Sequence, residues 1–236
     1  LYGAVLLTFG HFLMAFEGDA AGGQSNPAIN IFWLALAFII VGSGFLKANI
    51  SVIVGQLYPR TDVRRDGAYT IFYIGINTGA FLGTLVAGWL GETYGWAWGF
   101  GAAGVGMLLG LIVFVIGKPW LDGKGEPPEP ARLKEKVAGI PLEWLLYLCG
   151  FLAVGVCWWM IQNQALVGTL LGISGALLVA YVLYTAVVKL PAQDRDRIFA
   201  ALFLILGSIL FWALFEQAGS SLNLFADRHV DRGNIP

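Results

Sequence analysis

The chain has 236 residues, of which 58% are hydrophobic and only 12% are charged, and its mean hydropathy is +0.73. A soluble domain carries roughly twice that charged fraction, so the composition excludes a soluble globular protein and indicates an integral membrane protein. The 14 basic and 15 acidic residues leave a net charge of −1, which predicts no nucleic-acid partner. The chain does not begin with Met and starts within an apolar run, so we expect it to be a piece of a longer protein.

Seven apolar runs follow one another along the chain, the first of them truncated. They cover residues 1–16, 31–57, 68–90, 98–117, 142–161, 165–188 and 198–225. A bilayer core of about 30 Å needs about 20 apolar residues in a helix, and most of these runs reach that length. None of the runs alternates apolar and polar residues with a period of two, which excludes a transmembrane barrel. Since a backbone in lipid must satisfy its own hydrogen bonds, the predicted fold class is an all-α integral membrane protein.

The connections between these runs alternate in charge. Those at 17–30, 91–97 and 162–164 contain no Lys or Arg, whereas those at 58–67, 118–141 and 189–197 contain three, five and three. Basic connections stay on the cytoplasmic side, so the second group is predicted to be cytoplasmic in a multi-pass plasma-membrane protein. The segment 118–141 is rich in Pro, Glu and Lys, and we expect it to be a mobile linker.

Two charged residues, Lys47 and Glu216, lie well inside apolar runs. Each costs about 2.5–3.5 kcal/mol at mid-bilayer, so each is predicted to face protein or water rather than lipid. Lys47 shares a helix stripe with Ser43 and Ser51, four residues to either side. The stripe of Glu216 contains Ser208, Trp212, Ser220 and Asn223. An alternative for both charges is a structural ion pair buried between helices.

The run 68–90 has two different faces when it is plotted as a helix. Glycines at 75, 79 and 83 lie on one face, where another helix can approach closely. The opposite face carries Thr70, Tyr73, Asn77 and Thr84. We expect this polar face to border one cavity together with the stripes of Lys47 and Glu216. The alternative for Asn77 is a hydrogen bond that joins two helices.

The runs 142–161 and 165–188 carry no charge in their interiors. Small residues at four-residue spacing, Gly168, Gly172, Ala176 and Ala180, form a ridge on the second run. We therefore predict a tight helix hairpin that packs through this ridge and supports the bundle without binding a substrate.

Several patterns that suggest other functions fail on inspection. The string Gly-x-Gly-x-x-Gly at 99–104 has no preceding strand and no acidic residue about twenty positions later, so it is interpreted as helix packing. His11 and His229 have no second ligand at a usable spacing, so neither a metal nor another cofactor is predicted. No arrangement of serine, histidine and acid can be placed at one depth, so no catalytic residues are predicted.

Three stretches together resemble one known family. Residues 72–81, FYIGINTGAF, resemble the fifth-helix signature of the proton-dependent oligopeptide transporter family, a branch of the major facilitator superfamily. Residues 44–51, GFLKANIS, are similar to its fourth helix, and residues 211–217, FWALFEQ, to its seventh. Thr78 and Ala48 depart from the usual pattern without removing a functional group.

The resemblance implies a partial major-facilitator bundle, helices 3–7 of the family, with an inserted two-helix transmembrane hairpin. Residues 1–117 would belong to the N-terminal bundle, 118–141 to the cytoplasmic linker, 142–188 to the hairpin and 189–236 to the start of the C-terminal bundle. The family's helices one, two and eight onward would then lie outside this chain.

The resemblance also implies a function, which is proton-coupled uptake of di- and tripeptides by alternating access. Lys47 would lie near the peptide and interact with first-helix glutamates, while Glu216 would pair with a first-helix arginine and gate the outer side. Asn77 would hydrogen-bond the peptide, and Trp212 would line a side-chain pocket. Tyr73 and Ser220 are further candidates for peptide binding because they lie on the same stripes.

Other functions stay open at this stage. The chain could belong to a major-facilitator carrier for another small solute, such as nitrate, a drug or a sugar. A non-transporting membrane scaffold would tolerate the loss of both buried charges, with effects on folding only. An intramembrane enzyme would need a nucleophile, a base or a metal that the sequence does not offer.

Overall fold

The structure, a computed structural model, describes residues 1–16, 27–127, 129–137 and 139–230. Within these residues six helical stretches are long and apolar enough to cross a membrane, and a further apolar helix, α1 (Tyr2–Met14), is shorter. The long helices are α2 (Pro27–Gln56), α3 (Arg64–Tyr94), α4 (Trp96–Gly117), α6 (Leu142–Gln162), α7 (Gln164–Val188) and α8 (Ala192–Phe215). The prediction of an all-helical membrane protein is confirmed at this level, and every helix except α8 begins and ends within a few residues of its predicted span.

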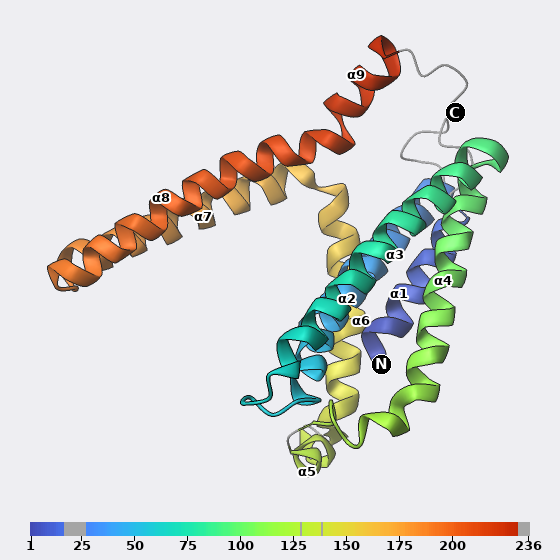
Figure 1. Cartoon of the computed structure of the whole chain (residues 1–236), viewed down its shortest axis with the longest axis horizontal. Helices are drawn as coiled ribbons and strands as arrows, with labels where there is room; N and C mark the ends of the chain where they lie inside the picture. Colours follow the sequence, from blue (N-terminus) through green and yellow to red (C-terminus); the bar gives the residue numbers. More distant parts are fainter. Residues whose placement is uncertain (17–26, 128, 138, 231–236) are drawn as a thin grey trace. The chain divides into compact units, whose positions relative to one another are not determined.

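The chain forms two compact units, Leu1–Val167 and Gly168–Pro236. In the first unit α1 packs against both α2 and α4, α3 packs against α4, and α6 packs against α2 (Figure 1). The core of this unit joins α1, α2 and α6 through Leu6, Ala37, Phe38, Val41 and Val154. Apart from Phe38 these side chains are small or medium in size, which lets the helix axes approach closely.

Glycines bring the helices of the first unit close together. A Cβ atom on Gly42 of α2 would lie 2.8 Å from the carbonyl oxygen of Gly3 and 2.8 Å from the backbone nitrogen of Leu7, both on α1. On α4, Gly104 faces the ring of Phe12, and Gly99 faces the backbone carbonyl of Ala87 on α3. The string Gly-x-Gly-x-x-Gly therefore serves helix packing, as its sequence context predicted.

Short elements occupy the segment that was predicted to be a linker. They are the 3-10 helix η2 (Lys118–Leu121), the helix α5 (Pro130–Lys134) and the strands β1 (Lys136–Val137) and β2 (Ile140–Pro141). The two strands pair in antiparallel fashion, Lys136 with Pro141 and Val137 with Ile140. This segment lies at the same end of the first unit as the connection between α2 and α3 (Figure 1). The mobility of the segment remains a prediction.

The second unit contains most of α7, the helix α8, the 3-10 helix η3 (Glu216–Gly219) and α9 (Ser221–His229). One prediction is wrong here, because the span 198–225 is not one continuous helix: α8 ends at Phe215, and the chain bends before α9 begins. The residues of the predicted ridge that are glycines, Gly168 and Gly172, have open space beside them. Because α6 belongs to the first unit, packing of the ridge against it remains a prediction.

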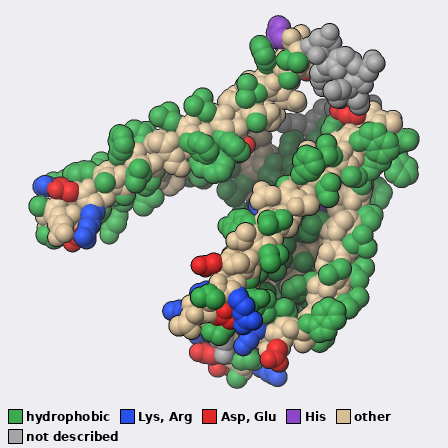
Figure 2. Space-filling model, in the orientation of Figure 1, with side chains coloured by type: hydrophobic (Ala, Val, Ile, Leu, Met, Phe, Trp, Pro, Cys, Tyr) green, Lys and Arg blue, Asp and Glu red, His purple; other side chains and the backbone are tan. Residues whose placement is uncertain are grey.

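Charged side chains gather at the ends of the helices. Figure 2 shows Lys, Arg, Asp and Glu clustered where α7 meets α8, and again around α5, with apolar side chains along the helices between. The cluster between α7 and α8 includes the ion pairs Arg195–Asp196 and Arg197–Asp194, each at 3.2 Å. An apolar middle with charged ends is the distribution that a bilayer requires of a spanning helix.

Candidate functional site

The six residues predicted to form the site lie on three helical stretches. In the first unit, Lys47 lies on α2, and Tyr73 and Asn77 lie on α3. In the second unit the remaining three residues follow one another along α8, η3 and the start of α9; they are Trp212, Glu216 and Ser220. All six side chains are exposed within the described part of the chain. A cavity shared by all six remains a prediction.

A contact near one end of α2 places its polar stripe next to that of α3. The hydroxyl of Tyr69 donates a hydrogen bond to the carbonyl oxygen of Ser51 at 3.2 Å. The same hydroxyl occupies the space beside Gly55, where a Cβ atom would collide with it. Residues four apart share a helix face, so the face of α3 with Tyr69, Tyr73 and Asn77 begins against the face of α2 with Ser51 and Lys47.

The heights of the predicted residues follow from this contact. The two helices run in opposite directions, and an α-helix rises about 1.5 Å per residue. Lys47 and Tyr73 therefore both lie about 6 Å from the contact of Tyr69 with Ser51, and Asn77 lies about 6 Å further along. By this estimate Lys47 and Tyr73 lie at one height on neighbouring helices, and Asn77 lies one turn away. Tyr69 was missed by the sequence analysis, although it lies four residues before Tyr73 on the same stripe.

The polar side chains of α3 are satisfied within their own helix. The amide nitrogen of Asn77 donates to the carbonyl oxygen of Tyr73 at 2.8 Å, and the hydroxyl of Thr84 donates to that of Ala80 at 2.7 Å. Among the described residues no hydrogen bond from Asn77 reaches another helix, so its carbonyl oxygen and second amide hydrogen have no partner there. Both roles predicted for Asn77, a contact with the peptide and a link to another helix, remain predictions.

Lys47 makes no ion pair within the described residues. The ion pairs found there lie in the connections or at helix ends, as with Arg64 and Asp62 at 2.8 Å or Lys118 and Glu126 at 2.8 Å. An unpaired ammonium group inside an apolar helix is costly unless water, substrate or another helix compensates for it. Lys47 is therefore the group on the first unit with the strongest requirement for a negatively charged partner.

Glu216 lies where the helix breaks. It is the first residue of η3, and the break ends at Ser220, whose φ of −131° and ψ of −97° are not helical. Side chains bridge the break, since Gln217 donates to the carbonyl oxygen of Ala213 at 3.2 Å and Ser221 hydrogen-bonds Gln217. A broken helix frees backbone groups, which membrane proteins tolerate only beside other protein or a water-filled cavity. The signal for this break was available in the polar and small residues of 216–221, EQAGSS.

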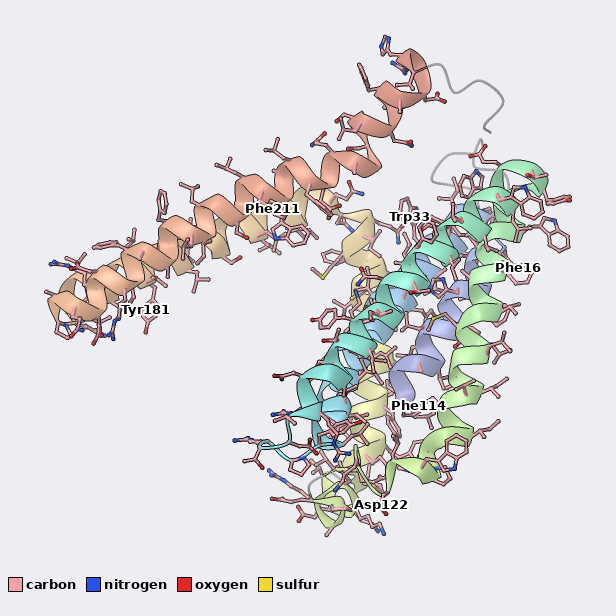
Figure 3. The ribbon with its side chains drawn as sticks, in the orientation of Figure 1. Phe16, Trp33, Phe114, Asp122, Tyr181 and Phe211 are labelled. Carbon is pink, nitrogen blue, oxygen red and sulfur yellow. The ribbon has the colours of Figure 1, made fainter. Side chains whose placement is uncertain are left out.

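Trp212 belongs to an aromatic cluster just before the break. Its ring lies 5.5 Å from that of Phe211, which is labelled in Figure 3, and 5.5 Å from that of Phe215, in edge-to-face geometry in both cases. Edge-to-face contacts stabilise aromatic pairs beyond the area that they bury. Trp212 is still 52% exposed, so one side of the indole is available to a ligand or to a further helix.

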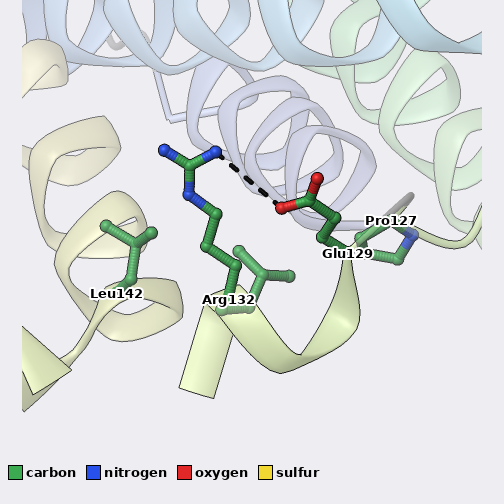
Figure 4. Close-up of a pocket in the computed structure, with 5 residues that line it drawn as sticks. Pro127, Glu129, Arg132 and Leu142 are labelled. Atoms are coloured by element: carbon green, nitrogen blue, oxygen red, sulfur yellow. Dashed lines mark ion pairs between the residues drawn. The ribbon is translucent and has the colours of Figure 1, made fainter. Parts of the chain in front are cut away.

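A pocket of about 290 Å³ lies on the linker, lined by Pro127, Glu129, Arg132, Leu133 and Leu142 (Figure 4). Arg132 and Glu129 form an ion pair of 3.9 Å across it, and both side chains are exposed. None of the six predicted residues lines this pocket. An exposed ion pair that is satisfied internally contributes little binding energy for a ligand, so we do not assign this pocket to the site.

Comparison with known proteins gives consistent matches along the chain. The family model described as the POT family matches residues 1–236. A peptide transporter, YePEPT, of Yersinia enterocolitica is 34% identical over 247 residues, covering 98% of this chain. Dipeptide and tripeptide permease A of Salmonella typhimurium is 32% identical over 234 residues, also covering 98% of this chain. An uncharacterised transporter, YclF, of Bacillus subtilis is 34% identical over 232 residues, or 97% of this chain.

Solved structures match as well. A crystal structure of the peptide transporter POT, a mutant in complex with alafosfalin, is 34% identical and superposes with a TM-score of 0.73 over 99% of this chain. The matched region is 46% of that structure's chain, and it is 46%, 43% and 45% of the three relatives in the order given. The chain thus spans a little under half the length of the proteins that it matches.

Proposed function

The chain belongs to the POT family, and we propose that it forms part of a transporter that couples proton influx to the uptake of di- and tripeptides by alternating access. The observation that carries this proposal is the family match along all 236 residues, which includes the three motif stretches on α2, α3 and the α8–η3 break. Two of the relatives are named for peptide transport, and one matched structure holds alafosfalin.

We assign the helices to the family's bundle as follows. Residues 1–117, with α1 to α4, correspond to helices 3–6 of the N-terminal bundle, and residues 189–236 open the C-terminal bundle. Residues 142–188, with α6 and α7, form the inserted hairpin, and 118–141 form the linker on the cytoplasmic side. The α2–α3 connection and the linker lie at the same end of the first unit. This supports the topology, because both were predicted to be cytoplasmic from their basic residues.

The roles of the charged residues follow from the substrate. A peptide with an ammonium group and a carboxylate must lose water to enter a cavity at mid-membrane, and fixed charges of opposite sign replace that water. Lys47 would bind the peptide carboxylate or a carboxylate of the cavity. Glu216, at the helix break, would hold a gate shut through an ion pair while it is ionised. Protonation of such carboxylates weakens the ion pairs and allows the two halves to reorient.

The neutral residues would set the fit of the peptide. Asn77 offers a carbonyl oxygen and an amide hydrogen one turn beyond Lys47, which suits the peptide backbone. Tyr73, at the height of Lys47, offers a hydroxyl, and Trp212 offers an apolar wall for a substrate side chain. Ser220 offers a hydroxyl at the break. The driving force is the proton, which gains about 2.3 kcal/mol on crossing 100 mV inward.

Uptake by the full-length transporter in proteoliposomes tests this function. We expect Lys47→Ala and Glu216→Gln each to abolish peptide accumulation driven by a proton gradient. Lys189→Ala and Glu129→Gln are matched controls, because they remove the same charges from connections instead of from spans, and we expect them to retain uptake. Full accumulation by either of the first two variants would refute the role assigned to that residue. Failure of the wild type to take up any peptide would refute the function itself.

A further inference from the structure

The chain that follows α4 folds into a compact turn over residues 118–127. Asp122, labelled in Figure 3, has a φ of 48°, and Gly123 and Gly125 have φ of 74° and 80°. The ion pair of Lys118 with Glu126 at 2.8 Å closes the turn. Within it, the backbone N–H of Lys124 donates to the carbonyl oxygen of Leu121 at 2.9 Å. The shape of this turn is therefore set by its own contacts.

The tip of the turn reaches the last turn of α2. The backbone N–H of Gly125 donates to the side-chain oxygen of Gln56 at 2.8 Å, across 69 residues of sequence. A Cβ atom on Gly125 would lie 2.9 Å from Cδ1 and Cγ1 of Ile53. Position 125 favours glycine because its φ is positive, and a larger residue there would also displace the side chain of Ile53. We call this contact of Gly125 with Gln56 and Ile53 the linker clasp.

A second contact holds the same end of α2 from another helix. Tyr69 of α3 hydrogen-bonds the carbonyl oxygen of Ser51 and fills the space beside Gly55, and the guanidinium of Arg65 lies 5.8 Å from the centre of the Tyr69 ring. Residues 51–56 are therefore bound to α3 through Tyr69 and to the linker through Gly125. Lys47 lies one turn before Ser51, about 13 Å along the helix from Gln56.

We propose that Gln56 and Gly125 are positioning residues for transport: the linker clasp makes the end of α2, the start of α3 and the linker move as one body when the cavity opens toward that end. This inference rests on the proposed function. Every element of the clasp lies in the first unit, so a reorientation of that unit as a rigid body keeps it closed. Loss of the clasp lets the end of α2 move separately from the linker, which slows reorientation. The tight packing of α2 on α1 at Gly42 still holds Lys47, so peptide affinity is retained.

Limited trypsin digestion of the full-length transporter measures how readily the linker clasp opens, independently of peptide transport. Lys124 directly precedes the clasped Gly125, and cleavage there requires the turn to open. Gln56→Met keeps the length of the side chain but removes the acceptor, whereas Gln56→Glu keeps an acceptor oxygen. We expect Gln56→Met to be cut after Lys124 about two- to tenfold faster than wild type, the factor that one net hydrogen bond provides. Gln56→Glu should be cut at the wild-type rate.

Initial rates of peptide uptake by the same variants then test the positioning role. We expect Gln56→Met to lower the maximal rate about two- to tenfold with KM unchanged, because the same hydrogen bond is lost. Gln56→Glu should transport as the wild type does. Gln162→Met is the matched control, since Gln162 lies at the end of α6 and, among the described residues, donates within its own helix to the carbonyl oxygen of Trp158.

The outcomes distinguish a failure of the linker clasp from a failure of the proposed transport function. Wild-type cleavage of Gln56→Met would show that no clasp exists, and faster cleavage with unchanged uptake would overturn the positioning role. A Gln56→Glu variant as slow as Gln56→Met would also overturn it, because the acceptor would then not matter. If the wild type took up no peptide, the proposed function would fail, while faster cleavage of Gln56→Met would still support the clasp.

Discussion

The apolar runs 31–57 and 198–225 each contain one charged residue, but the structure holds that residue in different ways. Lys47 lies inside α2, which is helical without interruption from Pro27 to Gln56. Glu216 lies directly after α8, on the 3-10 turn that separates α8 from α9. The position of Lys47 is therefore set by the neighbours of a rigid helix, whereas the position of Glu216 is set by a local break in the backbone.

Burial shows the same contrast. In α2 the buried residues all precede Lys47, from Ala35 to Gly42, and its last turns are held by Tyr69 and Gly125. In α8 no residue is buried within the described part of the chain. Substitutions at the packed positions of α2 should therefore lower the stability of the folded protein. Substitutions at the break after α8 should lower the transport rate instead, because α8 has few contacts within its unit.

The largest expected effect is the loss of folding after a change at Gly42. A side chain there meets backbone atoms of α1 at 2.8 Å, which cannot move aside as a flexible side chain can. We expect Gly42→Val to cost about 3 kcal/mol, the upper end for overpacking, and to lower the yield of folded protein sharply. Yield and thermal melting of the full-length protein in detergent measure this. Gly44→Val is the control, since a Cβ at Gly44 would meet no atom of another described helix within 4 Å. An equal loss of yield and melting temperature in both variants would contradict the prediction.

A second prediction concerns the break after α8. Replacing both Gly219 and Ser220 by Ala favours a continuous helix through residues 216–221, because Ala is better than Gly in a helix by about 1 kcal/mol. We expect slower hydrogen exchange across this stretch and a roughly fivefold lower uptake rate, which corresponds to that free energy. Gly207→Ala is the control, because Gly207 already lies within α8. Unchanged uptake by a variant with a demonstrably continuous helix would show that the break has no role.

Replacement of Asn77 should lower the affinity for peptide and leave the stability of the protein unchanged. Its amide bonds only its own helix within the described residues, so Asn77→Ala removes no link between helices. We expect the melting temperature to stay the same and KM for a dipeptide to rise about tenfold, as for the loss of one or two hydrogen bonds. Asn49→Ala is a matched control, since Asn49 makes the same local bond to Phe45 at 2.7 Å. A lower melting temperature for Asn77→Ala alone would favour the interpretation of a helix–helix link.

The smallest effect is expected at Asp62, in the connection between α2 and α3. Hydrogen bonds from the side chain and backbone N–H of Arg64, and the charge of its guanidinium, hold the pKa of Asp62 below its ordinary value. The resulting stabilisation is complete above the ordinary aspartate pKa of about 3.9 and is lost as the pH falls through the lowered value. NMR titration of labelled aspartate measures it. Arg64→Ala should return the pKa toward normal, and an Asp62 that titrates normally in the wild type would contradict the geometry.

The sequence predicted the class of fold and most helix bounds because these depend on local composition. A run of about 20 apolar residues has one stable form in a bilayer, and the start of α4 at Trp96 or α6 at Leu142 follows from where polar residues stop. The packing role of Gly99 and Gly104 was also predictable, since a dinucleotide-binding loop needs a strand directly before it and the helix α3 precedes α4 instead. The break at Glu216 was missed, although its polar and small residues were visible, because the apolar residues around it extend the helical pattern on both sides.

What the sequence by itself determined is the apolar spans, the family motifs and the places of Lys47 and Asn77 within their helices, all of which follow from the order of residues along the chain. Only the tertiary structure decided that Tyr69 meets Ser51, that Gly125 meets Gln56 and that α1 packs between its partners through Gly42. Such contacts join residues far apart in the chain, and their free energy depends on which surfaces become neighbours. Periodicity reports which face of a helix is polar or small, but it carries no information about which helix comes to lie against that face.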